Sequence, residues 1–338
     1  MERNEIEQLV AHGIFPYDQQ AKTRLIETAI SYILLKGSYA YKIKKNIKLS
    51  FLDFSTLEKR RHFCYEELRL NQRLAKDMYI NVFAVSKKGK QWSISTGPAK
   101  AKEYVILMKG MNPDHQLNAL LKKNRITKKP IRQLAQQLAD FHQNEKSLSL
   151  TYDPFFLSRE FADIEKFSST IEKKLGVDYY KLVQTCIQLS NHFVLLQQEF
   201  ISKRPCLGYF KNCHGDLHSQ NIFIEKKPVI FDCIEFREAF RHIDVLNEIA
   251  FLCMDLETYG YADLSKIFLT DYIKKTGYAF GKKEQLLFTY FKAYRSCIRA
   301  KVHTIEMSQH PSSTQIKEKV KKYIEGMAGY MIEIAGKF

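Results

Sequence analysis

Short hydrophobic runs separated by turns occupy much of the first third of the chain, and hydrophobic residues recur at helical spacing in most of the rest. From about residue 25 to residue 108, short apolar runs alternate with polar turns, a pattern that predicts strands. The same part contains one expected helix, residues 57–75, which keeps an apolar face and has Ser55 or Thr56 as a suitable N-cap. Strands are expected over residues 25–35, 39–43, 81–86, 91–95 and 103–108.

Beyond residue 113 the apolar residues mostly follow the helical period. Pro130 suits the first turn of a helix whose Ile131, Leu134, Leu138 and Phe141 recur at helical spacing. A segment from 213 to 232 interrupts this pattern with short strands and polar residues. Further helices are expected over about 155–203, 241–276, 282–306 and 314–336.

These patterns predict an α+β protein with a small mixed lobe followed by a larger, mostly helical lobe. We place the N-terminal lobe in residues 1–110 and the C-terminal lobe in residues 111–338, with the junction near Met108 to Pro113. A chain of 338 residues with 45% hydrophobic content is long enough to bury a core in each lobe.

Net charge indicates a preference for anions but does not identify a partner. Lysine and arginine total 53 against 37 for aspartate and glutamate, which gives a formal charge of +16. A surplus of this size attracts nucleotides, RNA or acidic membrane surfaces. The cations are spread along the chain, with short clusters at 42–45, 122–125 and 128–129, so we interpret most of them as solvated surface. Nucleic-acid binding is therefore an alternative that we do not favour.

The cysteines and the start of the chain indicate a cytoplasmic protein. No stretch approaches the roughly 20 apolar residues of a membrane span, and residues 1–5 lack the apolar core of a signal peptide. The seven cysteines are scattered and form no Cys-x-x-Cys pair, which favours reduced thiols over disulfides or a zinc site. We expect a cytoplasmic location and no membrane partner. The sequence does not predict an oligomeric state.

The clearest chemistry lies in residues 213–232. The run His-Gly-Asp-Leu-His-Ser-Gln-Asn at 214–221 precedes a hydrophobic strand, 229–231, that ends in Asp232. Phosphoryl transfer to a hydroxyl needs an aspartate that orients the hydroxyl and takes its proton, an asparagine that holds a metal, and a second aspartate at the metals on the phosphates. Asp216, Asn221 and Asp232 occur in that order. An ordinary polar turn capped by Asn221 would not explain the order.

A nucleotide site of this type also needs a strand lysine and a helix glutamate in the small lobe. Lys42 follows the small residue Ala40 by two positions on a predicted strand, so we choose it over Lys44. Glu67 is its expected partner, with Glu66 as the alternative, because a rotation of the helix would exchange them.

The junction between the lobes completes the expected nucleotide site. Backbone groups of Met108, Lys109 and Gly110 are expected to hydrogen-bond the adenine edge. ATP and Mg are the expected cofactors, with Asn221 and Asp232 as the metal ligands.

With these residues in place, the chain resembles an aminoglycoside phosphotransferase-like member of the protein-kinase-like superfamily. The resemblance rests on the His-Gly-Asp run, the strand ending in Asp232 and the helix Leu134 to His142. Residues 27–31 and 51–58 further resemble an uncharacterised bacterial branch of that family, often fused to a P-loop ATPase domain. The resemblance implies a bilobal protein-kinase-like fold.

The chain departs from the kinase pattern in three places. No Gly-x-Gly-x-x-Gly loop precedes Lys42, and the hairpin offers Thr28, Ser31 and Gly37 instead. Gly215 replaces the arginine that reads a phosphorylated activation loop, so regulation of the protein-kinase type is not expected. Cys233-Ile234-Glu235 follows Asp232 where a kinase has Phe-Gly, and we expect Glu235 either at the metal or facing the substrate.

We therefore expect a kinase that transfers the γ-phosphoryl of ATP to a hydroxyl of a small molecule. A polycationic acceptor would need an acidic pocket, and a chain of charge +16 is a poor attractor of cations, so a metabolite is favoured over an aminoglycoside. A pseudokinase or nucleotide-binding scaffold, a basic RNA-associated module, transfer to protein and transfer of the nucleotide remain open. The acidic candidates for a cationic acceptor are Glu235, Glu238, Asp255, Glu257 and Asp263.

Overall fold

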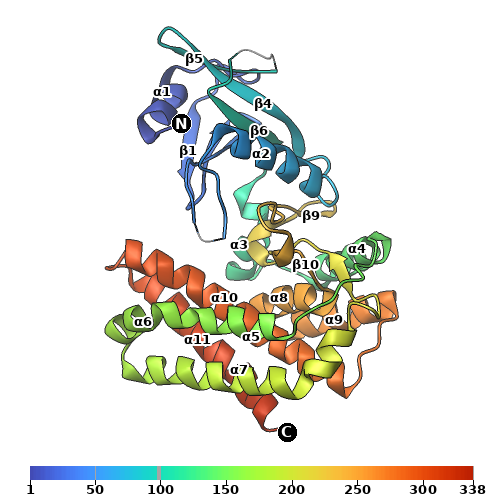
Figure 1. Cartoon of the computed structure of the whole chain (residues 1–338). Helices are drawn as coiled ribbons and strands as arrows, with labels where there is room; N and C mark the ends of the chain where they lie inside the picture. The colour runs from blue at the N-terminus through green and yellow to red at the C-terminus, as the bar shows by residue number, and fades with distance from the viewer. Residues whose placement is uncertain (50, 97–99, 338) are drawn as a thin grey trace. The chain divides into compact units, whose positions relative to one another are not determined.

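The computed structural model describes residues 1–49, 51–96 and 100–337. The chain forms two compact units (Figure 1). Unit 1 contains Met1–Lys123 and Gln220–Phe240, and unit 2 contains Asn124–Ser219 and Arg241–Phe338. Residues 220–240 thus pack with the first part of the chain. The functional division into lobes at residue 110 stays a prediction.

Unit 1 is built on a six-stranded sheet in the order β1-β2-β3-β6-β4-β5, with antiparallel neighbours throughout. A second hairpin, β8–β9, belongs to the same unit. The strands are β1 (Thr23–Glu27), β2 (Ser31–Lys36), β3 (Tyr39–Lys44), β4 (Tyr79–Lys88), β5 (Gln91–Ser95), β6 (Glu103–Lys109), β8 (Ile222–Ile224) and β9 (Pro228–Ile230).

The two faces of this sheet bury different sets of side chains, because successive residues of a strand point to opposite faces. One face packs under α1 (Arg3–His12), where Tyr41, Val105 and Leu107 join a core that includes Ile6 and Leu9. The other face packs against α2 (Leu57–Asn71) and contributes Ala40, Ile106 and Met108. The side chains of β3 therefore divide between two cores.

Helix α2 begins where the sequence predicts, since Thr56 caps it by accepting a hydrogen bond from the Lys59 N–H at 3.2 Å. The helix ends at Asn71, four residues before the predicted end. Unit 1 also contains α3 (Leu117–Lys122), whose preceding residue Gln116 forms a bridge with Phe223 in β8.

Unit 2 is mostly helical, with one short antiparallel pair, β7 (Phe210–Asn212) and β10 (His242–Asp244). Strand β7 leads directly into the loop that carries Asp216, and its partner β10 leads directly into α8. The helices are α4 (Lys128–Asn144), α5 (Phe155–Ala162), α6 (Ser168–Leu175), α7 (Val177–Lys203), α8 (Val245–Thr258), α9 (Ala262–Thr276), α10 (Lys282–Gln309) and α11 (Thr314–Ala335).

Three predicted elements are each divided in the structure. The expected strand 25–35 is two strands, because Thr28 Oγ1 accepts from the Ser31 N–H at 2.9 Å and closes a turn. The expected helix 155–203 is interrupted before α7 at Gly176, whose φ of 103° favours glycine. The expected helix 241–276 begins as β10 and is broken again around Gly260, whose φ is 89°.

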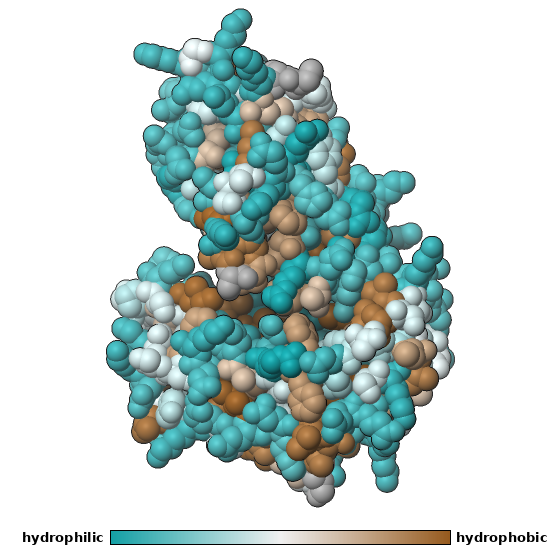
Figure 2. Space-filling model, in the orientation of Figure 1, coloured by the Kyte–Doolittle hydropathy of each residue, from teal (hydrophilic) through white to brown (hydrophobic). Residues whose placement is uncertain are grey.

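The face of the molecule drawn in Figure 2 is mainly polar. Figure 2 shows hydrophilic residues over most of the face in view, with hydrophobic residues in small separate groups. Among the described residues, no helix has both the length and the hydropathy needed to cross a membrane.

Candidate functional site

Strand β3 directs two lysines to the same face of the sheet. Lys42 and Lys44 are separated by one residue, Ile43, which points into the core under α1. Both lysines therefore face α2, where Glu67 lies in the middle of the helix. The two lysines are 7% and 1% exposed, so each needs a charged partner in the protein interior.

A cluster of five charged side chains satisfies this requirement. Lys42 Nζ lies 2.8 Å from Glu67 Oε1 and 2.6 Å from Asp232 Oδ1. Lys44 Nζ lies 2.5 Å from the other Glu67 oxygen and also pairs with Glu235. Glu67 thus bridges the two lysines, and each lysine has a second carboxylate of its own. Glu66, the alternative partner, pairs instead with Arg69 on the outer side of α2.

The cluster stabilises the charged forms of Glu67 and Lys42. Burial would raise the pKa of Glu67, but Lys42 and Lys44 outweigh it and lower this pKa to about 2. Burial would lower the pKa of Lys42, but Asp232 and Glu67 hold it well above its ordinary value. For Glu235, burial outweighs the effect of Lys44, and its pKa is raised. Of the two glutamates in this ion-pair network, Glu235 therefore protonates more readily than Glu67.

Asp232 follows the β8–β9 hairpin directly, which brings it next to Asn221. The backbone N–H of Phe231 donates to the carbonyl of Asn221 at 3.0 Å, so the residue before Asp232 meets Asn221 across the hairpin. Asp232 has a φ of 65°, a left-handed conformation that aspartate tolerates better than most residues. The carboxylate of Asp232 and the side-chain amide oxygen of Asn221 are donors that suit a hard divalent cation.

The segment after Asp232 is held to α2. The Cys233 N–H donates to Asn71 Oδ1 at 2.9 Å, and Asn71 Nδ2 donates to the carbonyl of Glu67 at 2.9 Å. Glu235, 6% exposed, reaches Lys44. The sequence left Glu235 at the metal or facing the substrate, whereas the structure pairs it with Lys44.

The predicted adenine-binding stretch lies at the end of β6. The Lys109 N–H donates to the carbonyl of Met78 at 2.8 Å, and the Gly110 N–H donates to the carbonyl of Ser38 at 2.7 Å. Gly110 also passes close to Ser38, where an added Cβ would lie 3.2 Å from the backbone. Both N–H groups are used within unit 1, so adenine binding here stays a prediction that must rely on the other backbone groups.

The turn at the position of a glycine-rich loop is closed by side chains. Thr28 Oγ1 lies 2.9 Å from the Ser31 N–H and 3.0 Å from the Ser31 carbonyl. Lys45 Nζ donates to the carbonyl of Thr28 at 2.6 Å and to Glu27 at 2.6 Å. The β1–β2 turn therefore has its own hydrogen bonds in place of the exposed N–H groups of a glycine-rich loop.

In unit 2, the loop that carries Asp216 is held through its backbone. Glu248, buried on α8, accepts hydrogen bonds from the N–H groups of His214 at 2.7 Å and Gly215 at 3.0 Å. Asp255 on the same helix accepts from the Ser219 N–H at 2.7 Å. Arg295 on α10 donates to the Gly215 carbonyl at 2.8 Å. The sequence did not predict the roles of Asp255 and Arg295.

Asp216 itself remains partly exposed at 36% and lies 3.3 Å from His218 Nε2. Burial would raise the pKa of Asp216, but His218 and Arg299 outweigh it and keep this pKa below its ordinary value. The carboxylate is therefore ionised at neutral pH, as a group that orients and accepts a proton from a hydroxyl must be.

Three buried side chains at the base of this loop could suggest a metal site. Ligand-type atoms of His142, Cys213 and Glu248 lie within 4.8 Å of one another. Each already has a protein partner: His142 Nδ1 lies 2.7 Å from the Tyr272 hydroxyl, Cys213 Sγ contacts the Ile243 carbonyl at 3.7 Å, and Glu248 accepts the two loop N–H groups. We interpret this group as support for the loop.

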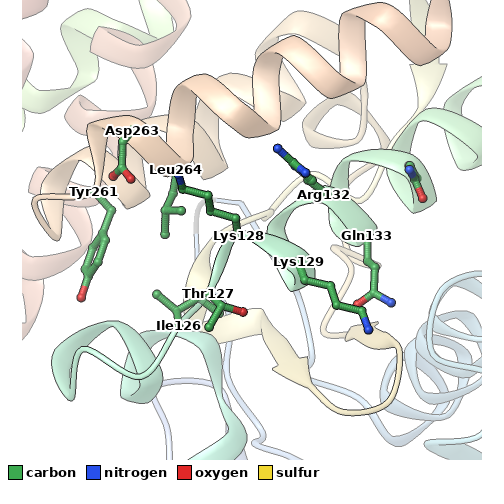
Figure 3. Close-up of a pocket in the computed structure, with 10 residues that line it drawn as sticks. Ile126, Thr127, Lys128, Lys129, Arg132, Gln133, Tyr261, Asp263 and Leu264 are labelled. Atoms are coloured by element: carbon green, nitrogen blue, oxygen red, sulfur yellow. The ribbon is translucent and has the colours of Figure 1, made fainter.

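Unit 2 also has a pocket of about 760 Å³ between the first turns of α4 and α9 (Figure 3). Lys128, Lys129 and Arg132 extend from α4 into its lining, against one carboxylate, Asp263, from α9. Its remaining lining residues include Thr127, Gln133, Gln136 and Tyr261. The pocket is therefore predominantly cationic.

Most of the carboxylates that the sequence offered for binding a cationic acceptor have hydrogen-bond or ion-pair partners within the protein. Glu235 pairs with Lys44, and Asp255 accepts from Ser219. Glu257 accepts from the Tyr330 hydroxyl at 2.5 Å, Ser265 Oγ at 2.7 Å and Lys292 Nζ at 3.0 Å. In unit 2, the Asp255 and Glu257 carboxylates are thus occupied by hydrogen bonds and an ion pair within that unit.

Two residues of the unit 1 cluster were not predicted in their actual roles. Lys44 was rejected in favour of Lys42, although a spacing of two on a strand places both on one face. The signal for Lys44 was thus present in the sequence. The pairing of Lys44 with Glu235 had no such signal, because it joins residues far apart in the chain through an irregular segment.

The chain has distant relatives of known sequence and structure. No family profile matches it. Uncharacterised proteins of Mycobacterium tuberculosis and Mycobacterium bovis are 27% identical over 288 residues, which is 84% of this chain and 55% of theirs. The chain thus spans about half the length of these curated relatives.

Among solved structures, two small-molecule kinases and a protein of the choline/ethanolamine kinase family have similar folds. A choline/ethanolamine kinase family protein from Mesorhizobium loti has a TM-score of 0.56 at 12% identity, covering 99% of this chain and 97% of its own. An amicoumacin kinase in complex with AMP-PNP and Ca²⁺ gives 0.57 at 13%, covering 97% and 94%. A choline kinase from Cryptosporidium parvum gives 0.58 at 10%, covering 99% and 97%.

An aminoglycoside phosphotransferase of the 4-Ia type is also similar, with a TM-score of 0.54 over 94% of this chain and 96% of its own at 8% identity. At these identities the likeness concerns the fold. The predicted fold class, an α+β protein with a small sheet lobe and a larger helical lobe, is confirmed. The chain has the protein-kinase-like fold that aminoglycoside phosphotransferases share with choline and ethanolamine kinases.

Proposed function

We propose that this protein is an ATP- and Mg-dependent phosphotransferase that transfers the γ-phosphoryl group to a hydroxyl of a small molecule. The observation that carries the proposal is the position of Lys42, whose Nζ lies within hydrogen-bond distance of both Glu67 and Asp232. A nucleotide phosphate can replace Asp232 as a partner of this lysine while Glu67 keeps it oriented. Solved structures with the same fold are named as kinases of choline, amicoumacin and aminoglycosides, which supports a small-molecule acceptor.

Each predicted residue has a defined task in this reaction. Asp216 orients the acceptor hydroxyl and takes its proton as the oxygen attacks the γ-phosphorus. Lys42, oriented by Glu67, binds phosphate oxygens. Asn221 and Asp232 would hold magnesium, which neutralises charge on the phosphates when bound. Backbone groups around Met108 to Gly110 receive the adenine.

The acceptor is a neutral or anionic molecule. The pocket that unit 2 offers is lined by Lys128, Lys129 and Arg132, and Asp255 and Glu257 are engaged in hydrogen bonds, so neither feature favours a polycation. Phosphorylation of a metabolite is therefore favoured over inactivation of an aminoglycoside.

The test is transfer of label from γ-labelled ATP, with magnesium, into a fractionated cell extract. Wild type, Asp216→Asn and the control Asp140→Asn, an exposed aspartate of α4, are compared. Label in a low-molecular-weight fraction with wild type and control, but not with Asp216→Asn, is expected. Retention of the labelled product on an anion exchanger and not on a cation exchanger would support the acceptor class. Equal labelling by Asp216→Asn would overturn the mechanism.

A nucleotide-binding scaffold is the second candidate. The self-closed β1–β2 turn and the engaged N–H groups of Lys109 and Gly110 favour it, because both reduce the backbone donors available to a nucleotide. Magnesium-dependent ATP binding without labelled product in any fraction would support this candidate over the transferase.

A further inference from the structure

The segment from Asp232 to Glu235 is attached to the rest of unit 1 at three successive points. Asp232 pairs with Lys42 on β3, the Cys233 N–H donates to Asn71 on α2, and Glu235 pairs with Lys44 on β3. The first of these contacts must be given up, at least in part, when Lys42 binds a phosphate. The other two can remain.

Lys44 is placed so that it cannot take part in phosphate binding itself. Its side chain is 1% exposed, and its Nζ lies 4.8 Å from the centre of the Phe54 ring, in contact with Glu67 and Glu235. Two lysines and two glutamates, Lys42, Lys44, Glu67 and Glu235, form a group without net charge. Breaking a buried pair in such a group leaves an uncompensated charge, which is strongly unfavourable.

We propose that the Lys44–Glu235 ion pair is a second, purely positioning pair, which holds the Asp232–Glu235 segment on β3 and keeps Glu67 in place while Lys42 exchanges Asp232 for a phosphate. The inference rests on the proposed function for its consequence in catalysis, but the attachment itself is a property of the protein without ligand. Lys44 and Glu235 are thus positioning residues. The Asp232–Glu235 segment, which contains the proposed metal ligand Asp232, is thus held by contacts within unit 1 and needs no phosphorylated loop to position it.

Cysteine labelling tests the attachment without any assay of activity. Cys233 is buried inside the segment, Cys64 is buried on α2 one turn from Glu67, and Cys206 is exposed. A thiol reagent should reach Cys233 when the segment opens, Cys64 only when unit 1 unfolds, and Cys206 at all times. Mass spectrometry of the three peptides therefore separates local opening from unfolding and from changes in the reagent.

The variants are Glu235→Gln, Lys44→Met and the control Lys36→Met, a buried lysine of β2 whose Nζ lies 3.3 Å from Thr23 Oγ1. Glu235→Gln and Lys44→Met should label Cys233 at least about tenfold faster than wild type, with no comparable increase at Cys64. Lys36→Met should not change the ratio of the Cys233 labelling rate to the Cys64 labelling rate. If Lys44→Met does not fold, Glu235→Gln, which keeps the side-chain size, decides the result. Unchanged Cys233 labelling in Glu235→Gln would overturn the proposal.

The consequence for catalysis is measured separately. Lys44→Met should raise the KM for ATP about tenfold or more, and Lys44→Arg, which keeps the charge, should restore much of it. If the wild type transfers no phosphate but Cys233 is labelled faster in the variants than in wild type, the proposed function is refuted and the attachment is established. An active wild type with unchanged Cys233 rates in the variants would refute the attachment and leave the function.

Discussion

The two units hold their candidate catalytic groups by different means. In unit 1, charged side chains hold one another, as Lys42 does with Glu67 and Asp232. In unit 2, buried carboxylates of α8 hold the backbone of the loop around Asp216, through Glu248 and Asp255. An ion pair can exchange one partner for a ligand, whereas a buried N–H that loses its acceptor has no substitute. Unit 1 is suited to exchange partners with a nucleotide, and unit 2 is suited to maintain a single loop geometry.

The largest expected effect separates the two units by kinetics. Asp216→Asn should lower kcat by roughly 100- to 10,000-fold, because in the proposed reaction Asp216 positions and deprotonates the hydroxyl. The dissociation constant for Mg-nucleotide should change little, since Asp216 belongs to unit 2. Steady-state kinetics and calorimetric titration with a non-hydrolysable ATP analogue provide the two values. A parallel loss of nucleotide affinity would contradict this separation.

The next effect concerns the stability of the unit 2 loop. Glu248→Ala leaves the buried N–H groups of His214 and Gly215 without their acceptor, and at about 1–3 kcal/mol for each the free energy of unfolding should fall by roughly 2–6 kcal/mol. Glu318→Ala, at an exposed position of α11, is the matched control and should cost less than about 1 kcal/mol. Urea unfolding followed by circular dichroism measures both. Equal stability of the two variants would show that the loop does not depend on Glu248.

The third effect should appear in unit 1 only. Asp232→Asn removes one negative charge from the expected metal ligands, so nucleotide affinity in the presence of magnesium should fall by at least about tenfold. Affinity without magnesium should fall less, because Lys42 keeps Glu67 as a partner. Titrations with and without magnesium measure the ratio. An unchanged ratio would remove Asp232 from the metal site.

The smallest effect distinguishes the units by acid sensitivity. Burial and Arg299 lower the pKa of His303 in unit 2 to about 4, so the unfolded chain takes up this proton first as the pH falls. The free energy of unfolding of unit 2 should therefore fall by roughly 1–3 kcal/mol between about pH 6.5 and pH 4. His303→Gln should abolish this dependence of stability on pH. Helix content, most of which belongs to unit 2, reports on this loss.

The corresponding loss in unit 1 should occur at lower pH. The pKa of Glu67 is lowered to about 2, so its contribution to stability is present above about pH 4.5 and is lost as the pH falls toward 2. The single tryptophan, Trp92, lies in β5 of unit 1 and reports on that unit by fluorescence. Coincident acid transitions of tryptophan fluorescence and helix content would contradict the distinction.

The sequence predicts much of unit 1, because strand patterns and motif order are local features that can be recognised without knowing how the chain packs. Residue type and order lead to the prediction of Lys42, Glu67, Asn221 and Asp232 as site residues, and the structure pairs Lys42 with Glu67 and Asp232. The sequence does not predict the shared role of Glu67 between two lysines, which depends on the rotation of α2 and the register of β3. It also places one strand at residues 25–35, because the hydrophobic run hides a turn made by the Thr28 side chain.

Unit 2 is harder to predict in detail, because its supports are tertiary. Gly176 was a visible signal that the helix 155–203 would be interrupted, and the apolar periodicity on both sides outweighed it. The use of Asp255 and Arg295 to hold the loop has no local pattern, since acceptor and donor meet only after α8 and α10 pack.

The left-handed backbone of Asp232 has a consequence for how this protein should be mutated. At a φ of 65°, a residue with an ordinary side chain costs about 1–2 kcal/mol, whereas asparagine and glycine fit more easily. An alanine scan would combine this backbone cost with the loss of charge and would exaggerate the importance of the carboxylate. Asparagine removes the charge and keeps the conformation, and glycine removes the whole side chain at little steric cost. A library at position 232 should therefore rank substitutions by backbone tolerance before it ranks them by chemistry.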